Sequence, residues 1–163
     1  MAVKTSIGII SDTHKIVHPR VFEVFKNVDQ IWHAGDIGRE DVITELSTIA
    51  PVTAVYGNSD SFPLVTKFLD EEKIQLYSFK FFLVHKFMSH RFERIISTKW
   101  EEDAVYNAII FGHTHQPLIH RANGVLYFNP GSCRYPRFSK IKTVGILTIN
   151  KNNQLLPEII SLS

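Results

Sequence analysis

Five apolar runs in this chain each end in a short polar motif, and this arrangement constrains the fold more than any other feature. The runs are rich in residues that favour strands, and they comprise Ile7 to Ile10, Ile31 to Trp32, Val52 to Val55, Phe81 to Val84 and Ile109 to Phe111. The motifs that follow them are Asp12-Thr13-His14, Gly35-Asp36, Gly57-Asn58, His85 and Gly112-His113-Thr114-His115. Because open α/β sheets place functional side chains just beyond the carboxyl ends of strands, we predict five strands that bring these motifs to one edge.

Two amphipathic segments separate the first three of these runs. Residues 19–28 place valine and phenylalanine side chains at helical spacing behind Pro19, and residues 39–49 carry an apolar stripe opposite charged side chains. Strands and helices therefore alternate in the first third of the chain. This order predicts a central sheet covered by helices, with right-handed crossovers between parallel strands.

The remainder of the chain has more strand patterns than helix patterns. Residues 74–79 and 80–84 resemble adjoining strands of a hairpin, and residues 91–107 fit a helical segment. Further strands are predicted at 118–121, 125–128, 143–149 and 155–162, with a tight turn at Asn123-Gly124. The sequence as a whole predicts two packed sheets with helices outside them.

Length and composition narrow the class of protein. A chain of 163 residues, 44% hydrophobic and 21% charged, fits a single globular domain over residues 1–163. A net charge of +2 with dispersed basic residues gives no reason to expect a nucleic-acid surface, and no apolar stretch approaches the roughly 20 residues that span a bilayer. One cysteine and no signal-peptide pattern make the cytoplasm the expected location.

The polar motifs contain the residue types that bind hard and borderline metal ions. Taken alone, neither of two motifs indicates metal binding, because Asp12-Thr13-His14 also fits a helix cap and Gly57-Asn58 also fits a tight turn. Together, the carboxylates, imidazoles and amide oxygen, without a thiolate, favour manganese, iron, zinc or nickel over calcium or monovalent copper. Asp36 is the best candidate for a carboxylate that bridges two ions.

In their order and residue types, the five motifs resemble those of the calcineurin-like metallophosphoesterase superfamily. Asn129-Pro130-Gly131-Ser132, the short chain and the absence of a cap domain resemble the small YfcE-like phosphodiesterases of that superfamily. The resemblance implies a four-layer α/β/β/α sandwich with two mixed β-sheets. It also implies two divalent ions, for which we expect manganese, with nickel, zinc, iron and cobalt as alternatives.

The resemblance assigns each motif residue to one of two ions. One ion would be held by Asp12, His14, Asp36 and His115. The other would be held by Asp36, Asn58, His85 and His113. A hydroxide activated by both ions would then attack a phosphodiester in line, and Asn58 would also contact the phosphate. Asp36 and Asn58 are thus the predicted catalytic residues.

Two positions depart from the family pattern. Many members have a histidine after Gly-Asn that protonates the leaving group, whereas this chain has Ser59 followed by Asp60. Without that donor, leaving groups of low pKa should be favoured. Lys86 follows His85 where members usually have glycine, and its ammonium either points to solvent or acts on the second ion or a phosphate.

The other polar and aromatic residues have less specific roles. We expect His18, His90 and His120 to be structural, His33 to support the site, and Cys133 to be a packing residue. Arg134 and Arg137 either contact a substrate phosphate or lie on the surface. Three further aromatic residues could line a substrate cleft or a homo-oligomer interface, and these are Phe87, Tyr135 and Phe138.

These observations favour one function over two alternatives. The leading hypothesis is a binuclear-metal-dependent phosphodiesterase that hydrolyses a small phosphodiester. The first alternative is a phosphomonoesterase of the same fold. The second is a non-catalytic protein-binding scaffold similar to the retromer subunit that shares this fold. Neither a membrane nor a nucleic acid is an expected partner.

Overall fold

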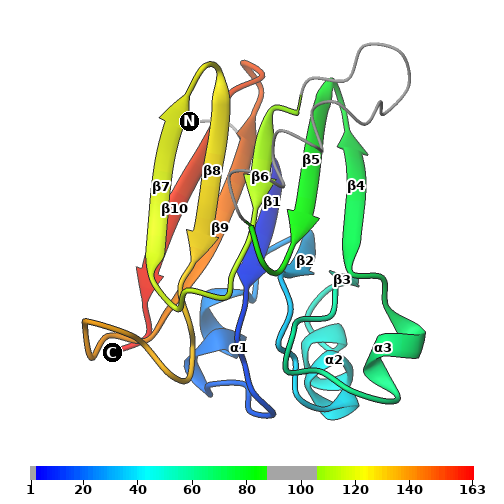
Figure 1. Cartoon of the computed structure of the whole chain (residues 1–163). Helices are drawn as coiled ribbons and strands as arrows, with labels where there is room; N and C mark the ends of the chain where they lie inside the picture. Colours follow the sequence, from blue (N-terminus) through cyan, green and yellow to red (C-terminus); the bar gives the residue numbers. More distant parts are fainter. Residues whose placement is uncertain (1–2, 88–105) are drawn as a thin grey trace.

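The computed structural model describes residues 3–87 and 106–163, and its centre consists of two packed β-sheets (Figure 1). The strands of the first sheet are β1 (Val3–Ile10), β2 (Gln30–His33), β3 (Val52–Ala54), β9 (Thr143–Asn150) and β10 (Leu155–Ser161). Those of the second are β4 (Glu71–Leu76), β5 (Phe79–Val84), β6 (Ala108–Ile110), β7 (Pro117–Ala122) and β8 (Val125–Pro130). Their orders are β10-β9-β1-β2-β3 and β4-β5-β6-β8-β7, and both sheets mix parallel with antiparallel pairs. The predicted fold class is therefore confirmed.

Parallel pairing brings the ends of the motif-bearing strands together. In the first sheet Ile10 is in register with His33, and His33 with Ala54. In the second sheet Leu83 is in register with Ile110. The arrows of β1 and β5 in Figure 1 point to the same end of the molecule, so the loops that follow them meet there. This confirms the predicted convergence of polar motifs from separate strands.

The main core lies between the two sheets. Alternate residues of β1, Ile7 and Ile9, belong to the same fully buried cluster as Phe81 and Leu83 of β5. Trp32 packs edge-on against Phe81, with 4.9 Å between ring centroids. Because side chains alternate across a strand, Ile10 lies on the other face of the first sheet. This alternation determines which side chains of the first sheet face the second sheet and which face the opposite side.

Within the described residues, the first sheet is accompanied by three short helices, which are α1 (Arg20–Val24), α2 (Glu40–Ser47) and α3 (Leu64–Lys67). Side chains of α1 and α2, such as Val21 and Leu46, pack with the outer face of that sheet. Both helices are shorter than predicted, and α3 was not predicted because four residues are too few to show a period. The helix predicted at 91–107 falls mostly outside the described residues, and Tyr106 and Asn107 are not helical.

The hairpin between β4 and β5 differs from the prediction, whereas the one between β7 and β8 agrees with it. The first turn lies at Tyr77-Ser78, not at the junction of residues 79 and 80. Tyr77 has φ 56°, and its hydroxyl lies 2.6 Å from Thr5 Oγ1, so contacts with β1 stabilise a residue type that usually favours strands. In the second turn Asn123 and Gly124 have φ 52° and 78°, as a type I′ turn requires.

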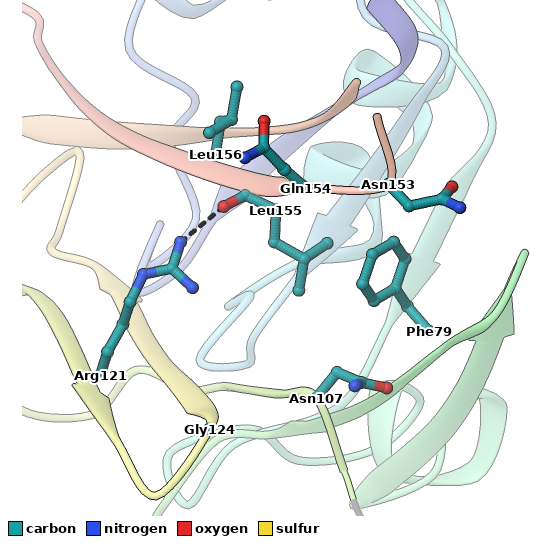
Figure 2. Close-up of a pocket in the computed structure, with 8 residues that line it drawn as sticks. All are labelled: Phe79, Asn107, Arg121, Gly124, Asn153, Gln154, Leu155 and Leu156. Carbon is teal, nitrogen blue, oxygen red and sulfur yellow. Dashed lines mark hydrogen bonds between the residues drawn. The ribbon is translucent and has the colours of Figure 1, made fainter. Parts of the chain in front are cut away.

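A cavity of about 430 Å³ lies at the end of the sheets opposite the polar loops (Figure 2). Phe79 at the start of β5 lines it, together with Leu155 at the start of β10. Arg121 crosses its rim and donates a hydrogen bond to the Leu155 carbonyl. This cavity is separate from the polar loops, because His85 follows the other end of β5. Over the described residues, no helix has the length and apolar character needed to span a membrane.

Two phenylalanines on one stretch of chain allow a matched test of the core. Phe128 is fully buried between the sheets, whereas Phe138 is 93% exposed. We expect Phe128→Ala to lower the free energy of unfolding by about 3 to 5 kcal/mol, because it leaves a cavity in the core. Phe138→Ala should change it by less than about 0.5 kcal/mol. Urea denaturation followed by circular dichroism measures both, and equal losses would contradict the assigned core.

Candidate metal centre

Asp12 is a fully buried carboxylate at the end of β1, and one of its oxygens has no ordinary partner. Oδ2 accepts hydrogen bonds from the Ser11 hydroxyl at 2.7 Å and from the His113 backbone N–H at 3.0 Å. Among the described residues no group donates a hydrogen bond to Oδ1. Burial would raise the pKa of Asp12, but the imidazoles of His115 and His85 hold it below its usual value. An ionised oxygen is thus aimed into the centre of the loops.

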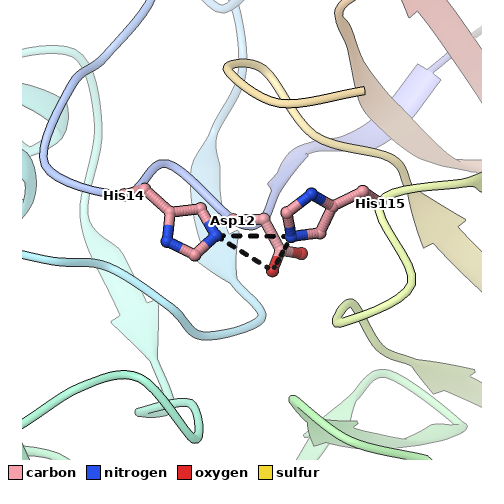
Figure 3. Close-up of side chains that lie close together, drawn as sticks. All are labelled: Asp12, His14 and His115. Atoms are coloured by element: carbon pink, nitrogen blue, oxygen red, sulfur yellow. Dashed lines mark hydrogen bonds and ion pairs between the residues drawn. The ribbon is translucent and has the colours of Figure 1, made fainter. Parts of the chain in front are cut away.

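His14, from the same loop as Asp12, and His115, from the loop between β6 and β7, both face this oxygen (Figure 3). The His115 Nε2 atom lies 3.1 Å from Asp12 Oδ1, and the His14 Nε2 atom lies 3.8 Å from it. The two Nε2 atoms are 3.3 Å apart. His115 donates its Nδ1 proton to the Tyr135 carbonyl at 2.6 Å, which leaves the Nε2 lone pair of the neutral ring toward Asp12. Three potential ligand atoms therefore converge.

A second group forms around His85, which is 2% exposed at the end of β5. Its Nδ1 proton is donated to the Ala34 carbonyl at 2.8 Å, so its Nε2 faces the site. That Nε2 atom lies 3.2 Å from Asp36 Oδ2 and 3.0 Å from Asn58 Oδ1. The Asn58 oxygen is also 3.0 Å from His113 Nδ1. The four side chains predicted to hold the second ion are therefore neighbours.

The two groups share their carboxylates. Asp36 Oδ2 lies 3.8 Å from His14 Nε2 as well as 3.2 Å from His85. Asp12 Oδ1 is similarly placed between His115 and His85, at 3.1 and 3.9 Å. Asp36 Oδ1 accepts a hydrogen bond from the Ser59 N–H at 2.9 Å, so Oδ2 alone faces both groups. The geometry is consistent with the prediction that Asp36 lies between the two groups. However, only its Oδ2 atom lies near both groups, whereas the prediction was that its two oxygens would be shared between two ions.

This donor set fits divalent cations. Neutral imidazole Nε2 atoms and carboxylate oxygens are all electron-pair donors, and they repel one another at 3.1 to 3.3 Å unless a positive charge lies between them. In the protein without ions, protonation of an imidazole would supply that charge. Although burial lowers the pKa of His85, its contacts with Asp36 and Asp12 raise it overall. Metal ions would replace such protons.

Comparison with known proteins decides the family. A model of the calcineurin-like phosphoesterase superfamily domain matches residues 6–152 of the 163-residue chain. The chain belongs to the calcineurin-like phosphoesterase superfamily. The resemblance inferred from the five motifs is thereby confirmed.

Two curated relatives of this calcineurin-like phosphoesterase are archaeal. A probable metallophosphoesterase of Methanothermobacter thermautotrophicus is 34% identical over 139 residues, which cover 82% of this chain and 80% of the relative. A phosphodiesterase of Methanocaldococcus jannaschii is 32% identical over 161 residues, which cover 89% of this chain and 93% of the relative. Both alignments extend over most of each protein.

Solved structures confirm the phosphoesterase fold. An archaeal phosphodiesterase superposes with TM-score 0.72 at 27% identity, covering 95% of this chain and 99% of its own. YfcE of Escherichia coli gives TM-score 0.68 at 19% identity, with 97% and 100% covered. Zinc-bound Vps29 of Entamoeba histolytica gives the same TM-score and identity, with 97% and 99% covered. At 19% identity, the last two comparisons show the fold alone.

Glycines allow the loops of this phosphoesterase to approach one another. A Cβ atom on Gly57 would lie 2.1 Å from Asp36 Oδ1, and one on Gly112 would lie 2.7 Å from Asp12 Oδ2. Each glycine of these two motifs therefore packs against a carboxylate from another loop. This explains why glycine, rather than another turn-forming residue, precedes Asn58 and His113.

Asp60 has a supporting role that the sequence did not reveal. Its carboxylate accepts hydrogen bonds from the backbone N–H groups of Ile37, Gly38 and Gly57, at 3.0, 2.8 and 2.9 Å. It thus joins the loop after β2 to the loop after β3. The available signal was its position two residues after Asn58, but the same position also fits an ordinary turn.

His33 supports the loops and makes no hydrogen bond to any of the predicted ligand side chains. Its Nδ1 accepts a hydrogen bond from the Gly35 N–H at 3.1 Å, so the proton of the neutral ring is on Nε2. That proton points to the Thr13 hydroxyl at 3.0 Å, which in turn donates to the Ile37 carbonyl. Complete burial lowers the pKa of His33 to about 3, so the ring stays neutral in this network. The predicted supporting role therefore fits the geometry.

The end of β8 and the segment that follows it also hold the loops of the site. Ser132 donates its hydroxyl proton to the Asp12 carbonyl at 2.9 Å, and Asn129 donates to the Gly112 carbonyl at 3.0 Å. The Arg134 guanidinium donates to the carbonyl of His14. This contact gives Arg134 a structural role in positioning a site loop.

The remaining sequence expectations have varied outcomes. Cys133 is buried, and burial raises the pKa of its thiol to about 12, as expected for a packing residue. Lys86 and Arg137 are exposed, as is His120, whereas His18 is only partly so. Phe87 is not an exposed cleft residue, because it is partly buried against Phe111 and Tyr127. His90 lies outside the described residues.

Replacing Asp60 tests whether it holds the two loops together. We expect Asp60→Asn to lower the free energy of unfolding by about 1 to 3 kcal/mol, because backbone donors lose a charged acceptor. We also expect weaker manganese binding, since the loops that carry Asp36 and Asn58 would no longer be fixed. Urea denaturation and calorimetric metal titration measure the two effects. Asp41→Asn, at an exposed site on α2, is the matched control, and equal behaviour of both variants would refute the role of Asp60.

Proposed function

We propose that this phosphoesterase is a binuclear-metal-dependent phosphodiesterase that hydrolyses a small phosphodiester. The observation that carries the proposal is the convergence of imidazole nitrogens and carboxylate oxygens into two adjoining groups with shared carboxylates. The archaeal relative named as a phosphodiesterase, 32% identical over 89% of this chain, supports the choice of a diester. We propose manganese as the metal, with nickel, zinc, iron and cobalt as alternatives.

In this proposal each ion has its own set of ligands. Asp12, His14, Asp36 and His115 would hold one ion. Asp36, Asn58, His85 and His113 would hold the other. Bound ions would supply an activated water and would polarise phosphoryl oxygens for in-line displacement.

Differences in exposure indicate the side from which substrate would approach. Asp12, Asp36 and His85 are buried at the base of the site. Asn58 is exposed and His113 is partly exposed. A phosphate would therefore meet the Asn58 amide first, and this neutral group adds no negative charge to repel it. The buried carboxylates would remain shielded from water beneath it.

Ser59 affects how the leaving group departs. Its backbone N–H is used to hold Asp36 Oδ1, and its short hydroxyl side chain is exposed. A serine hydroxyl is a far weaker acid than an imidazolium, so it donates no proton efficiently near neutral pH. Substrates whose leaving group is stable as an anion should therefore be preferred.

Two alternatives are tested together with the main proposal. A phosphomonoesterase would use the same groups, with the exposed Lys86 beside His85 to balance the second phosphate charge. A protein-binding scaffold is the other alternative, since Vps29 has the same fold. The converging lone pairs favour an enzyme, because a scaffold does not need them. We further propose a cytoplasmic location and retain a homo-oligomer as an alternative to the monomer.

A metal and substrate matrix on chelator-stripped protein tests the proposed function. We expect hydrolysis of bis(4-nitrophenyl) phosphate to return on addition of manganese, nickel or cobalt, and to exceed hydrolysis of the monoester. Asp36→Asn should lower kcat/KM by about 100-fold or more, because it weakens a carboxylate shared by both ions. Metal content by mass spectrometry should fall in the same variant.

Asp41→Asn is the control, since it removes an exposed carboxylate from α2, outside the site. Its activity and metal content should equal those of the wild type. Metal binding without hydrolysis of either ester, in wild-type protein, would contradict the enzyme proposal and favour the scaffold. Faster hydrolysis of the monoester would favour the phosphomonoesterase.

The absence of a strong acid at Ser59 gives a second test. We expect the wild-type protein to cleave methyl phosphodiesters with a nitrophenyl leaving group at least about 100-fold faster than those with an alkyl leaving group. This ratio of rates should be larger in the wild type than in Ser59→His. The histidine variant should narrow this gap by protonating the alkoxide. Single-turnover rates across a series of leaving-group pKa values measure the effect. If the logarithm of the rate fell equally steeply with leaving-group pKa in the wild type and in Ser59→His, the proposed role of this position would be ruled out.

A further inference from the structure

Tyr135 places an exposed aromatic ring at the edge of the candidate metal centre. It lies in the loop between β8 and β9 and is 50% exposed. Its ring centroid is 5.5 Å from that of His14, with a 55° angle between the planes. His14 is one of the side chains proposed to hold an ion. The tyrosine ring is thus within reach of a substrate group that extends past this histidine.

Several contacts fix the position of this ring. The Tyr135 backbone N–H donates to the Ser132 hydroxyl at 2.9 Å, and its carbonyl accepts the His115 Nδ1 proton. The Arg134 guanidinium lies 4.6 Å from the ring centroid, in cation–π contact, and also donates to the His14 carbonyl. Main chain and side chain are therefore both held by residues of the site.

An exposed ring held by such contacts is well suited to bind another aromatic group. Because the contacts already restrict its conformation, stacking on it costs less conformational entropy than stacking on an unrestrained side chain. The Tyr135 side chain packs only partly against other residues, so half of its surface remains available. Phe138 provides a contrast in the same loop, since it is 93% exposed and makes no ring contact with another described residue.

We propose that the Tyr135 ring is a stacking surface for a planar aromatic group in one ester arm of the substrate. This inference rests on the proposed function, because it assumes that the phosphoryl group binds at the metal centre. It narrows the substrate class to phosphodiesters with an aryl or heteroaromatic arm. Tyr135 would then determine specificity without acting on the bond that breaks.

Phosphonates that differ only in their organic arm test this proposal on the full, manganese-loaded chain. Calorimetry would compare phenylphosphonate, cyclohexylphosphonate and methylphosphonate, which share the phosphoryl anion and are not hydrolysed. Wild-type protein should bind the phenyl compound about 2- to 10-fold more tightly than the cyclohexyl compound, since aromatic pairs gain this much beyond burial. It should prefer phenyl over methyl by about 10-fold or more.

Variants separate stacking from a general effect on the loop. Tyr135→Leu should reduce the preference for phenyl over cyclohexyl to within about 2-fold, while affinity for methylphosphonate and metal content stay unchanged. Tyr135→Phe should retain the preference, because the ring and not the hydroxyl is required. Phe138→Ala, the matched control, should also retain it.

Three results would overturn the inference. The first is a phenyl preference that survives in Tyr135→Leu. The second is an equal loss of affinity for all three phosphonates, which would indicate that Tyr135 only positions His14. The third is an equal effect of Phe138→Ala. In each case, hydrolysis of bis(4-nitrophenyl) phosphate by the same preparation would still support the proposed function. If the protein neither hydrolysed this ester nor bound any of the phosphonates, both the proposed function and the role of Tyr135 would be overturned.

Discussion

Two buried carboxylates, Asp12 and Asp36, are the constraint on which the arrangement of the loops depends. A carboxylate taken out of water needs donors or a cation nearby, and each of these has one oxygen satisfied by hydrogen bonds. The backbone donors to these oxygens come from loops after other strands. The remaining oxygens face histidines. Burial of charge therefore forces separate segments together, and the same burial leaves acceptors available for metal ions.

The sequence predicted the elements that follow simple periodicity and the residues that carry distinctive chemistry. The strands that end at Ile10 and Val84 were recognisable because apolar residues stop abruptly at a polar motif. Likewise, His113 and His115 were notable because imidazoles in a loop behind a buried strand have few other uses. The structure places all seven predicted ligand residues around a single region, although their role as ligands remains a proposal.

Features that depend on tertiary contact could not be predicted in this way. Tyr77 occupies a turn because contacts with Thr5 and Lys4 stabilise it there, against its preference for strands. Asp60 and Ser132 have ordinary side chains, and their importance comes from backbone groups that only the fold brings near them. Local sequence contains no signal for such partners. The same reason explains the misjudged Phe87, whose burial depends on Phe111 and Tyr127.

The candidate ligands are divided between the two sheets. Four of them, Asp12, His14, Asp36 and Asn58, follow strands of the first sheet, whereas His85, His113 and His115 follow strands of the second. Ions bound among them would link the two sheets at one end of the sandwich, and separation of the sheets would have to break metal–ligand bonds. By mass action, stability would then rise by about 2.7 kcal/mol at a free metal concentration 100 times the dissociation constant. The supply of metal would thus govern the fraction of chains that are folded as well as how fast they react.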